Sequence, residues 1–138
     1  MADDRLERMK HLIRDHYDAG VNNQDLDKLD AHLTDDFIDH AMPPETPRGP
    51  AGVKEWLGKL KTAMPDLTVA IDDIVAEGDK VALRATWTGT HTAEIFGMPP
   101  TGRIITFSGA VFWRIEDDRI AERWGYIDTV ELMKKLRG

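Results

Sequence analysis

The sequence predicts an α+β domain in which helices cover one face of a curved antiparallel sheet. Apolar residues recur at three- and four-residue spacing in the N-terminal half, and from Leu67 onward they alternate with polar residues. Helices followed by a meander of strands are typical of this class. A curved sheet covered on one side encloses a cone-shaped space, which predicts a pocket. The 138 residues form one predicted domain, residues 1–138, because no linker or repeat divides them.

Three helices are predicted before the sheet. The first spans residues 3 to 20, on the helical spacing of Leu6, Met9, Ile13 and Tyr17. A short second helix follows Asp25, which is a favourable capping residue. The third begins near Pro50 and is stopped by Pro65, since proline is tolerated only in the first turn.

Period-two alternation predicts a short extended piece at residues 37–40 and four long strands. The strands run from Leu67 to about Ala76, from Val81 through Trp87, from Gly102 to Ile115 and from Ile120 to Ile127. A C-terminal helix opens at Asp128. The strand from Gly102 to Ile115 is largely apolar on both faces, so its outer face needs a cover. We therefore predict a homodimer through the sheet face.

Composition excludes several classes of protein. With 25 acidic and 18 basic residues the formal charge is −7, and no basic cluster suggests nucleic-acid binding. The absence of cysteine excludes disulfides and thiolate metal sites. No apolar run is long enough to span a membrane, and the charged start MADDRLERMK has no signal-peptide pattern. The sequence thus predicts a cytoplasmic protein, and the pocket expected from the curved sheet predicts a small-molecule ligand.

The stretch from Thr86 to Arg103 is predicted to form one wall and the rim of the pocket. His91 ends the same alternating stripe as Trp87, beside the rigid turn Met98-Pro99-Pro100-Thr101-Gly102-Arg103. His40 ends the first extended piece. If both histidines face one pocket, they supply hydrogen-bonding or base capacity near neutral pH.

Asp128 is the predicted acid/base residue. Alternation along the last strand puts Glu122, Trp124, Tyr126 and Asp128 on one face, and an acid beside aromatic surface has a raised pKa. Asp128 also precedes a helix, so it is equally a candidate N-cap, with Glu131 three residues later. Both roles are compatible with one aspartate.

No cofactor or metal motif is present. Asp39, His40, His91 and Asp128 are the scattered residues that would have to form any N/O metal site, and neither an HxH nor an HExxH spacing occurs. The sequence also lacks P-loop, GxGxxG and GxSxG patterns. We expect Arg84 and Arg123 to point outward or to pair with acids.

Taken together, six motifs resemble the SnoaL-like polyketide cyclases and related ester cyclases of the nuclear transport factor 2-like superfamily. They are Phe37-Ile38-Asp39-His40, Gly52-Val53, Pro65-Asp66-Leu67, Gly89-Thr90-His91, the turn from Met98 to Arg103, and Trp124-Gly125-Tyr126-Ile127-Asp128. The resemblance covers nearly the whole chain. It implies the same α+β cone and an intramolecular aldol ring closure without metal or cofactor.

The resemblance also implies site residues. Asp128 would take the proton α to a carbonyl, and His91 and His40 would hold the enolate or orient the substrate. We predict that the substrate contacts are Trp124, Tyr126, Phe96, Trp87, Arg103 and Phe37. The alternatives are an isomerase, a dehydratase, an epoxide hydrolase with an inward Arg103 or Arg84 between two aspartates, or a non-catalytic binding protein.

Overall fold

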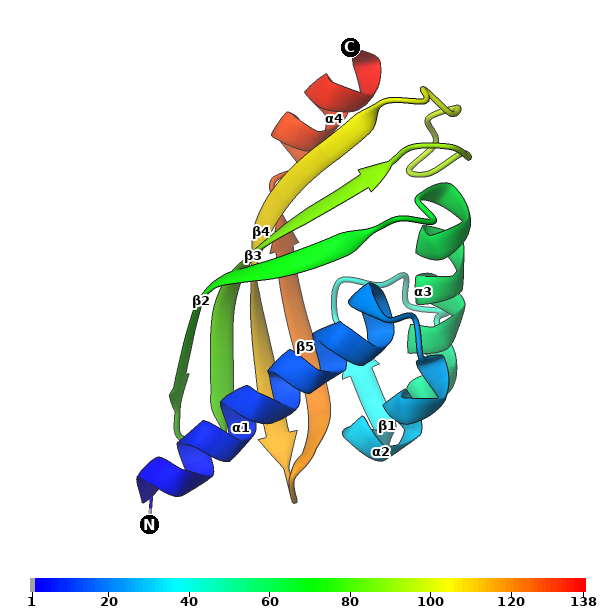
Figure 1. Cartoon of the computed structure of the whole chain (residues 1–138). Coiled ribbons are helices and arrows are strands. Elements are labelled where there is room, and N and C mark those ends of the chain that lie inside the picture. Colours follow the sequence, from blue (N-terminus) through cyan, green and yellow to red (C-terminus); the bar gives the residue numbers. More distant parts are fainter. Residues whose placement is uncertain (1) are drawn as a thin grey trace.

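The computed structural model describes residues 2–138 and contains a strongly curved sheet with helices against one face (Figure 1). The elements follow one another as α1 (Ala2–Tyr17), a π-helical turn (Asp18–Asn22), a 3-10 turn (Leu26–Lys28), α2 (Leu29–His32), β1 (Leu33–Asp39), α3 (Pro50–Ala63), β2 (Thr68–Glu77), β3 (Lys80–Thr90), β4 (Ile104–Glu116), β5 (Arg119–Ile127) and α4 (Thr129–Arg137). The predicted α+β class is confirmed, and so is the predicted order in which the helices α1 to α3 precede the antiparallel strands.

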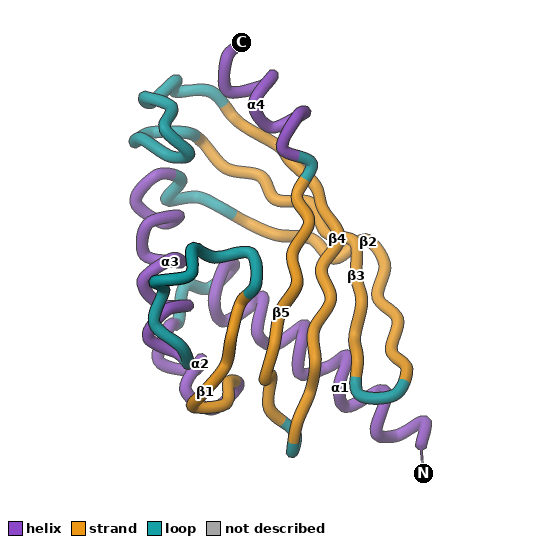
Figure 2. Tube along the Cα trace, turned by 180° about the vertical axis from the view of Figure 1, so that it is seen from behind, coloured by secondary structure: helices purple, strands orange, loops and turns teal. Residues whose placement is uncertain are grey.

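The five strands have the order β1-β5-β4-β3-β2. Strands β2 to β5 form the predicted antiparallel meander, whereas β1 pairs with β5 in the parallel direction. Seen from behind, β5 lies between β1 and β4 (Figure 2). The last strand, β5, is therefore not an edge. It is hydrogen-bonded to β1 on one side and to β4 on the other.

Helix α1 crosses the sheet with its apolar stripe inward. Met9, Ile13 and Tyr17 are buried, as the helical spacing predicts. The α-helix ends at Tyr17 rather than at Gly20, and a π-helical turn carries the chain to Asn22. The Asn22 amide both donates to and accepts from the backbone of Val69 in β2, at 3.2 and 2.8 Å. This clamp fixes the C-terminal end of the helix against the sheet.

Alternate residues of the strands face the helices and form the core. On β3 and β4 these include Val81, Leu83, Ala85, Trp87, Phe107, Val111 and Trp113, all of which are buried. Trp87 stacks on Phe107 with ring centroids 5.5 Å apart. Within residues 2–138 we find no helix with the length and apolarity of a membrane span.

Candidate functional site

A β-bulge at Ala121 decides which side chains of β5 face the helices. Ile115 of β4 pairs with Ile120, but the preceding residue, Arg114, pairs with Glu122, so Ala121 is an extra residue in β5. Such an insertion reverses the facing of every later residue. Ile120 is completely buried, and Arg123, not Glu122, shares its face.

The bulge makes one sequence prediction wrong. Glu122, Trp124 and Tyr126 lie on the outer face of the sheet and not in the interior, because simple alternation from Ile120 does not hold across an inserted residue. Tyr126 is 63% exposed. Arg123, which we expected to point outward or pair with acids, is paired with an acid but lies on the inner face.

Arg123 forms a largely buried ion pair with Asp39 at the end of β1. Its Nη1 lies 3.2 and 3.1 Å from the two carboxylate oxygens. The side chains retain only 15% and 10% of their accessible surface, and the Ala41 N–H also donates to Asp39 at 2.9 Å. Solvent therefore reaches both partners, although they lie in the covered interior. The guanidinium carbon lies 5.4 Å from the centroid of the Trp113 ring.

Glycine at position 125 leaves space for this guanidinium. A Cβ built on Gly125 would lie 2.6 to 2.8 Å from the Nη1, Cζ and Nη2 atoms of Arg123. These distances are well inside van der Waals contact, so the arginine head lies directly over the backbone of Gly125.

Two further polar groups beside Arg123 have no partner. The Tyr17 hydroxyl and the Trp113 indole nitrogen are buried without a hydrogen bond, and their rings meet edge to face at 5.7 Å. Burial raises the pKa of Tyr17 to about 12, although the positive charge of Arg123 and the nearby N–H donors of Trp113 and Arg123 oppose part of this shift. Buried polar atoms without partners are rare in proteins and typically mark a place for water or a ligand.

His16 completes the cluster on the side of α1. Its ring contacts Trp113 edge to face at 5.2 Å and His32 at 6.0 Å. Burial, with smaller contributions from the charges of His32 and Arg123, lowers the pKa of His16 to about 3. At neutral pH His16 and Tyr17 are thus uncharged, and the charges of Arg123 and Asp39 balance. The inner cluster, defined as Tyr17, Asp39, Trp113 and Arg123, is donor-rich but electrically neutral.

His91 lies in the interior, as predicted. It is completely buried, its Nδ1 lies 3.1 Å from the Thr101 hydroxyl, and its Nε2 has no partner. Its backbone N–H and C=O bond to Arg103 and Gly102, which tie the turn to the end of β3. The turn thus holds the backbone of His91 through Gly102 and Arg103 and its ring through Thr101. The catalytic role expected of His91 stays a prediction.

Asp128 does not join His91. Its carboxylate accepts the Glu131 N–H at 3.0 Å and so caps α4, and the residue is exposed. The capping role is confirmed. The acid/base role stays a prediction, and the side chain of the nearby Tyr126 points to solvent.

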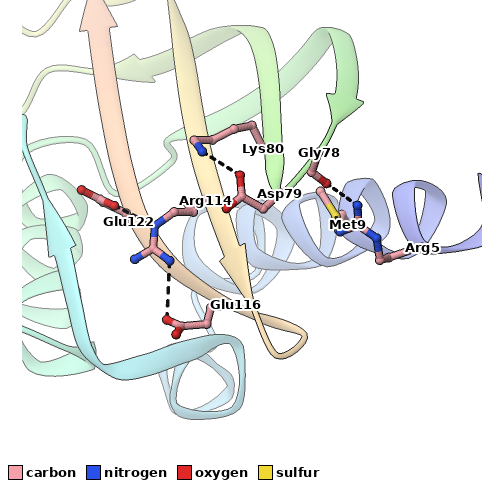
Figure 3. Close-up of polar contacts among 8 residues, drawn as sticks. All are labelled: Arg5, Met9, Gly78, Asp79, Lys80, Arg114, Glu116 and Glu122. Carbon is pink, nitrogen blue, oxygen red and sulfur yellow. Dashed lines mark hydrogen bonds and ion pairs between the residues drawn. The ribbon is translucent and has the colours of Figure 1, made fainter. Parts of the chain in front are cut away.

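His40 lies on the outer face, away from the other two predicted catalytic residues. Its Nε2 contacts Glu122 at 2.6 Å, and its ring stacks on Trp124 at 5.2 Å. Arg114 donates to the other Glu122 oxygen at 2.8 Å and pairs with Glu116 (Figure 3). The hydrogen bonds from Arg114 and His40 lower the pKa of Glu122. The condition that both histidines face one pocket is not met, because His40 follows the inward Asp39 and adjacent residues of a strand face opposite ways.

The predicted substrate contacts are also divided. Trp87 and Phe37 are buried on the interior side, and Trp87 lies 6.4 Å from Tyr17 between ring centroids. Phe96 is 47% exposed against Trp56. Arg103 donates to the carbonyls of Lys135 and Leu136 at 2.9 and 2.6 Å, so it caps the C-terminus of α4 instead of facing a ligand.

The space available for a ligand differs from the predicted open pocket. Aromatic rings occupy the centre of the interior, and the side chains of Arg123 and Asp39 keep 15% and 10% of their accessible surface. An open groove of about 650 Å³ instead runs along α1, lined by side chains such as Arg8, Leu12, Ile74 and Ile115. No three His, Asp or Glu side chains in the described part of the chain are grouped to hold a metal ion.

Comparison with known proteins decides the family. A family model described as SnoaL-like polyketide cyclase matches residues 11–136. The chain belongs to the SnoaL-like polyketide cyclase family. The match includes α3, the whole sheet and most of α4.

Solved structures agree with this family. TsrD from Streptomyces laurentii is 28% identical, with a TM-score of 0.86 over 94% of this chain and 95% of that one. IdmH from Streptomyces antibioticus, named as a candidate polyketide cyclase, is 32% identical with a TM-score of 0.80 over 94% and 99%. AclR from Streptomyces galilaeus, named as a candidate hydroxylase, is 26% identical with a TM-score of 0.80 over 96% and 97%. No curated protein matches the sequence significantly. The fold is thus the nuclear transport factor 2-like cone of this family.

Sequence reasoning missed Arg123, Tyr17 and Trp113 as a group. Tyr17 and Trp113 fit apolar core positions, and nothing in the pattern distinguishes them from packing residues. One signal did exist: a glycine in the middle of an apolar strand, Gly125, is typical of a close approach by another group. That group is the Arg123 side chain.

Proposed function

We propose that this protein is a cofactor-independent enzyme that performs acid/base chemistry on a hydrophobic carbonyl compound at the inner cluster. The supporting observation is the set of donors gathered there: the Tyr17 hydroxyl and the Trp113 indole nitrogen, both buried and unpartnered, beside the Arg123 guanidinium. Donors fixed in a water-poor interior stabilise a developing oxyanion far better than water does. A ketone or ester becomes an oxyanion when it loses an α-proton.

Asp39 is the proposed base of this cluster. In the first step the α-C–H bond of the substrate would break: the proton moves to the Asp39 carboxylate, and the bonding electrons pass to the carbonyl oxygen of the substrate. The enolate carbon then attacks a second carbonyl of the same molecule, and Asp39 returns the proton to the new alkoxide. Arg123 keeps the carboxylate in place through two contacts of 3.1 and 3.2 Å.

The proposal moves the acid/base role from Asp128 to Asp39, and it keeps His91 as a second interior candidate. His91 is buried with an unpartnered Nε2 and a Nδ1 held by Thr101. Asp128, in contrast, is exposed and occupied as a helix cap. The hydrophobic ligand is favoured by the surrounding aromatic rings of Trp87, Phe107 and Trp113.

Epoxide ring opening is the second candidate function. The sequence argument required an inward arginine between two aspartates, and Arg123 supplies the inward arginine with Asp39 on one side. Arg84 and Arg103 do not, because Arg84 pairs with Asp73 on the outer face and Arg103 caps α4. Among the described residues Arg123 pairs with one carboxylate only, which favours the carbonyl reaction.

The test combines a ligand screen with a proton-exchange assay. Aromatic polyketide esters, steroids, terpenoid epoxides and fatty acyl compounds are screened by native mass spectrometry and thermal shift. Deuterium uptake at the methyl group of 2-acetonaphthone in D₂O then reports α-proton abstraction. The variants are Asp39→Asn, His91→Gln and Asp128→Asn, with Tyr126→Phe on the exposed outer face as the matched control.

We expect exchange in the wild type and in the Asp128→Asn and Tyr126→Phe variants, and its loss in Asp39→Asn. Loss in Asp128→Asn with retention in Asp39→Asn would return the acid/base role to Asp128 and refute the inner cluster. Ligand binding without exchange or turnover in any variant would identify a binding protein instead.

A further inference from the structure

Gly125 differs from Gly49, Gly52 and Gly109 in what an added side chain would contact, whereas Gly138 likewise lies against a guanidinium, that of Arg103. Added Cβ atoms at Gly49, Gly52 and Gly109 would meet backbone carbonyl oxygens at 2.1 to 2.6 Å. At Gly125 all three nearest atoms belong to the Arg123 guanidinium. A methyl group at position 109 would therefore distort the sheet, whereas one at position 125 meets only the flexible end of a side chain.

We infer that Gly125 is a positioning residue that holds the Arg123 guanidinium against Asp39. The inference rests on the proposed function for its catalytic meaning. Arg123 and Gly125 are two residues apart in β5, so their side chains share the inner face. Without a Cβ at position 125, the guanidinium lies close to the backbone of β5 and reaches Asp39 on the neighbouring strand β1.

Glycine is an unfavourable residue for this position on other grounds. Val111 and Ile127 flank it on the inner face, as its cross-strand partner and the next inward residue of β5. A β-branched or larger apolar side chain would pack better in the middle of a strand. No positive φ angle requires glycine at 125, unlike Gly49 or Gly102. The space that Gly125 leaves for the Arg123 guanidinium accounts for a glycine at this position.

A methyl group at position 125 should therefore displace the Arg123 guanidinium while leaving the backbone of the sheet unchanged. The guanidinium must move by enough to restore van der Waals contact, and the Nη1 contacts with Asp39 at 3.1 and 3.2 Å are the ones it would lose. The Asp39 carboxylate would then remain in the interior without its cation. Arg123 would also leave the face of Trp113.

The experiment is a double-mutant cycle between Gly125→Ala and Asp39→Asn, followed by urea unfolding. Gly58→Ala is the matched control, because nothing lies within 4 Å of a Cβ built on Gly58 in α3. In the wild-type background Asp39→Asn leaves Arg123 unpaired and should raise the unfolding equilibrium constant by about tenfold or more. In the Gly125→Ala background the pair is already broken, so the same change should raise it by only about threefold or less.

Two further readouts distinguish positioning from simple packing. The NMR signals of the Arg123 Nε–H and of the Trp113 indole N–H should shift in Gly125→Ala and remain unchanged in Gly58→Ala. In the 2-acetonaphthone exchange assay, Gly125→Ala should lower kcat with little change in KM. Adding Arg123→Lys should recover part of the rate, since the ammonium group is narrower than the guanidinium.

Additive effects in the cycle, unshifted Arg123 signals or failure of Gly125→Ala to fold would each overturn the inference. Coupling in the cycle with shifted signals supports it even if 2-acetonaphthone is never exchanged, and in that case the proposed function alone fails. Exchange that continues at the wild-type rate in a Gly125→Ala protein with displaced Arg123 would contradict a positioning role in catalysis.

Discussion

The Tyr17 hydroxyl illustrates, at the scale of one residue, how a site can be distinguished from a core. A buried hydroxyl without a partner destabilises the fold by its desolvation, so packing alone gives no reason to keep it. Removing it should therefore separate stability from function.

In Tyr17→Phe we expect the free energy of unfolding to stay the same or to rise by about 1 kcal/mol, because a buried unsatisfied group is removed. Ligand affinity or proton exchange should fall by about tenfold, as one oxyanion donor is lost. Urea unfolding and the exchange assay measure the two effects, with Tyr126→Phe as the exposed control. A clear loss of stability would mean that the hydroxyl has a structural partner.

His16 predicts a pH dependence of stability. Its pKa is lowered to about 3 in the folded protein, from 6.5 in the unfolded chain. Between these values the unfolded state binds one more proton than the folded state. The free energy of unfolding should therefore fall with decreasing pH, by about 1.4 kcal/mol per pH unit from this group below pH 6.5.

The variant His16→Phe should remove this slope, whereas His11→Phe, at an exposed position of the same helix, should retain it. Urea unfolding at several pH values between 4 and 7 measures both. An unchanged slope in His16→Phe would assign the acid sensitivity to other groups.

At the scale of elements, α4 depends on charge at both ends. Asp128 caps its N-terminus, and Arg103 donates to its last carbonyls. The two residues that the sequence assigned to substrate chemistry thus hold one short helix in place. A structural role and a catalytic role make different predictions for the same position.

Asp128→Ala should lower the free energy of unfolding by about 1 kcal/mol, because the Glu131 N–H loses its acceptor. Asp128→Ser should restore most of this stability, since serine also caps helices, although it carries no carboxylate. Thermal unfolding measures the stability, and the exchange assay measures catalysis. Wild-type exchange in Asp128→Ser is expected, and its loss would favour Asp128 as the acid/base residue.

The turn at residues 95–98 carries backbone strain. Phe96 and Gly97 both have positive φ angles, 53° and 76°, between the reciprocally bonded Ile95 and Met98. Glycine adopts this conformation freely and a bulky aromatic residue does not. Phe96→Gly should therefore raise the free energy of unfolding by about 1 kcal/mol, as measured by urea unfolding, whereas Gly97→Ala should lower it. Destabilisation in Phe96→Gly would mean that its contact with Trp56 outweighs the strain.

The sequence was sufficient for most elements of this fold. Helical and strand periodicity located α1, α3 and β2 to β5 within a few residues, and the Asp128 cap followed from local chemistry. Which side chains of β5 point into the interior was not predictable in the same way. The Ala121 bulge has no clear local signal in the sequence. It nevertheless puts Arg123 in the interior, where uninterrupted alternation from Ile120 would put Glu122.

Tertiary geometry also accounts for the remaining differences. The parallel pairing of β1 with β5 brings Asp39 beside Arg123, although the two residues are 84 positions apart in sequence. No local pattern records such a contact. The same pairing places His40 beside Trp124 on the opposite face, so one register decides both the inner cluster and the outer surface.

At the scale of the whole molecule, the outer face of the sheet is apolar in its centre. Cross-strand pairing forms one row from Val75 through Ala82 and Phe112 to Trp124, with Tyr126 beside it. Val75, Phe112 and Tyr126 are 64%, 46% and 63% exposed. Exposed apolar surface of this kind is typical of an interface.

Charges around these apolar rows are already paired within the chain. Arg84 pairs with Asp73 at one side, and Arg114 pairs with Glu122 at the other. A second copy of the chain can therefore approach without bringing unpaired like charges together, despite the formal charge of −7. Exposed apolar residues with neighbouring charges already paired are compatible with the two-fold contact that a homodimer requires, and on this basis the homodimer stays a prediction.

Tyr126→Glu should convert the predicted dimer to a monomer, because it adds a carboxylate to the exposed apolar surface of each copy. Tyr126 is mostly exposed, so the substitution should leave the fold intact. Thr62→Glu on α3 adds the same charge away from the sheet and should leave the dimer unchanged. Sedimentation velocity at micromolar concentration distinguishes the two species. A wild-type protein that sediments only as a monomer would refute the interface, and the exposed row of Val75, Phe112 and Tyr126 would then have to be covered by a different protein.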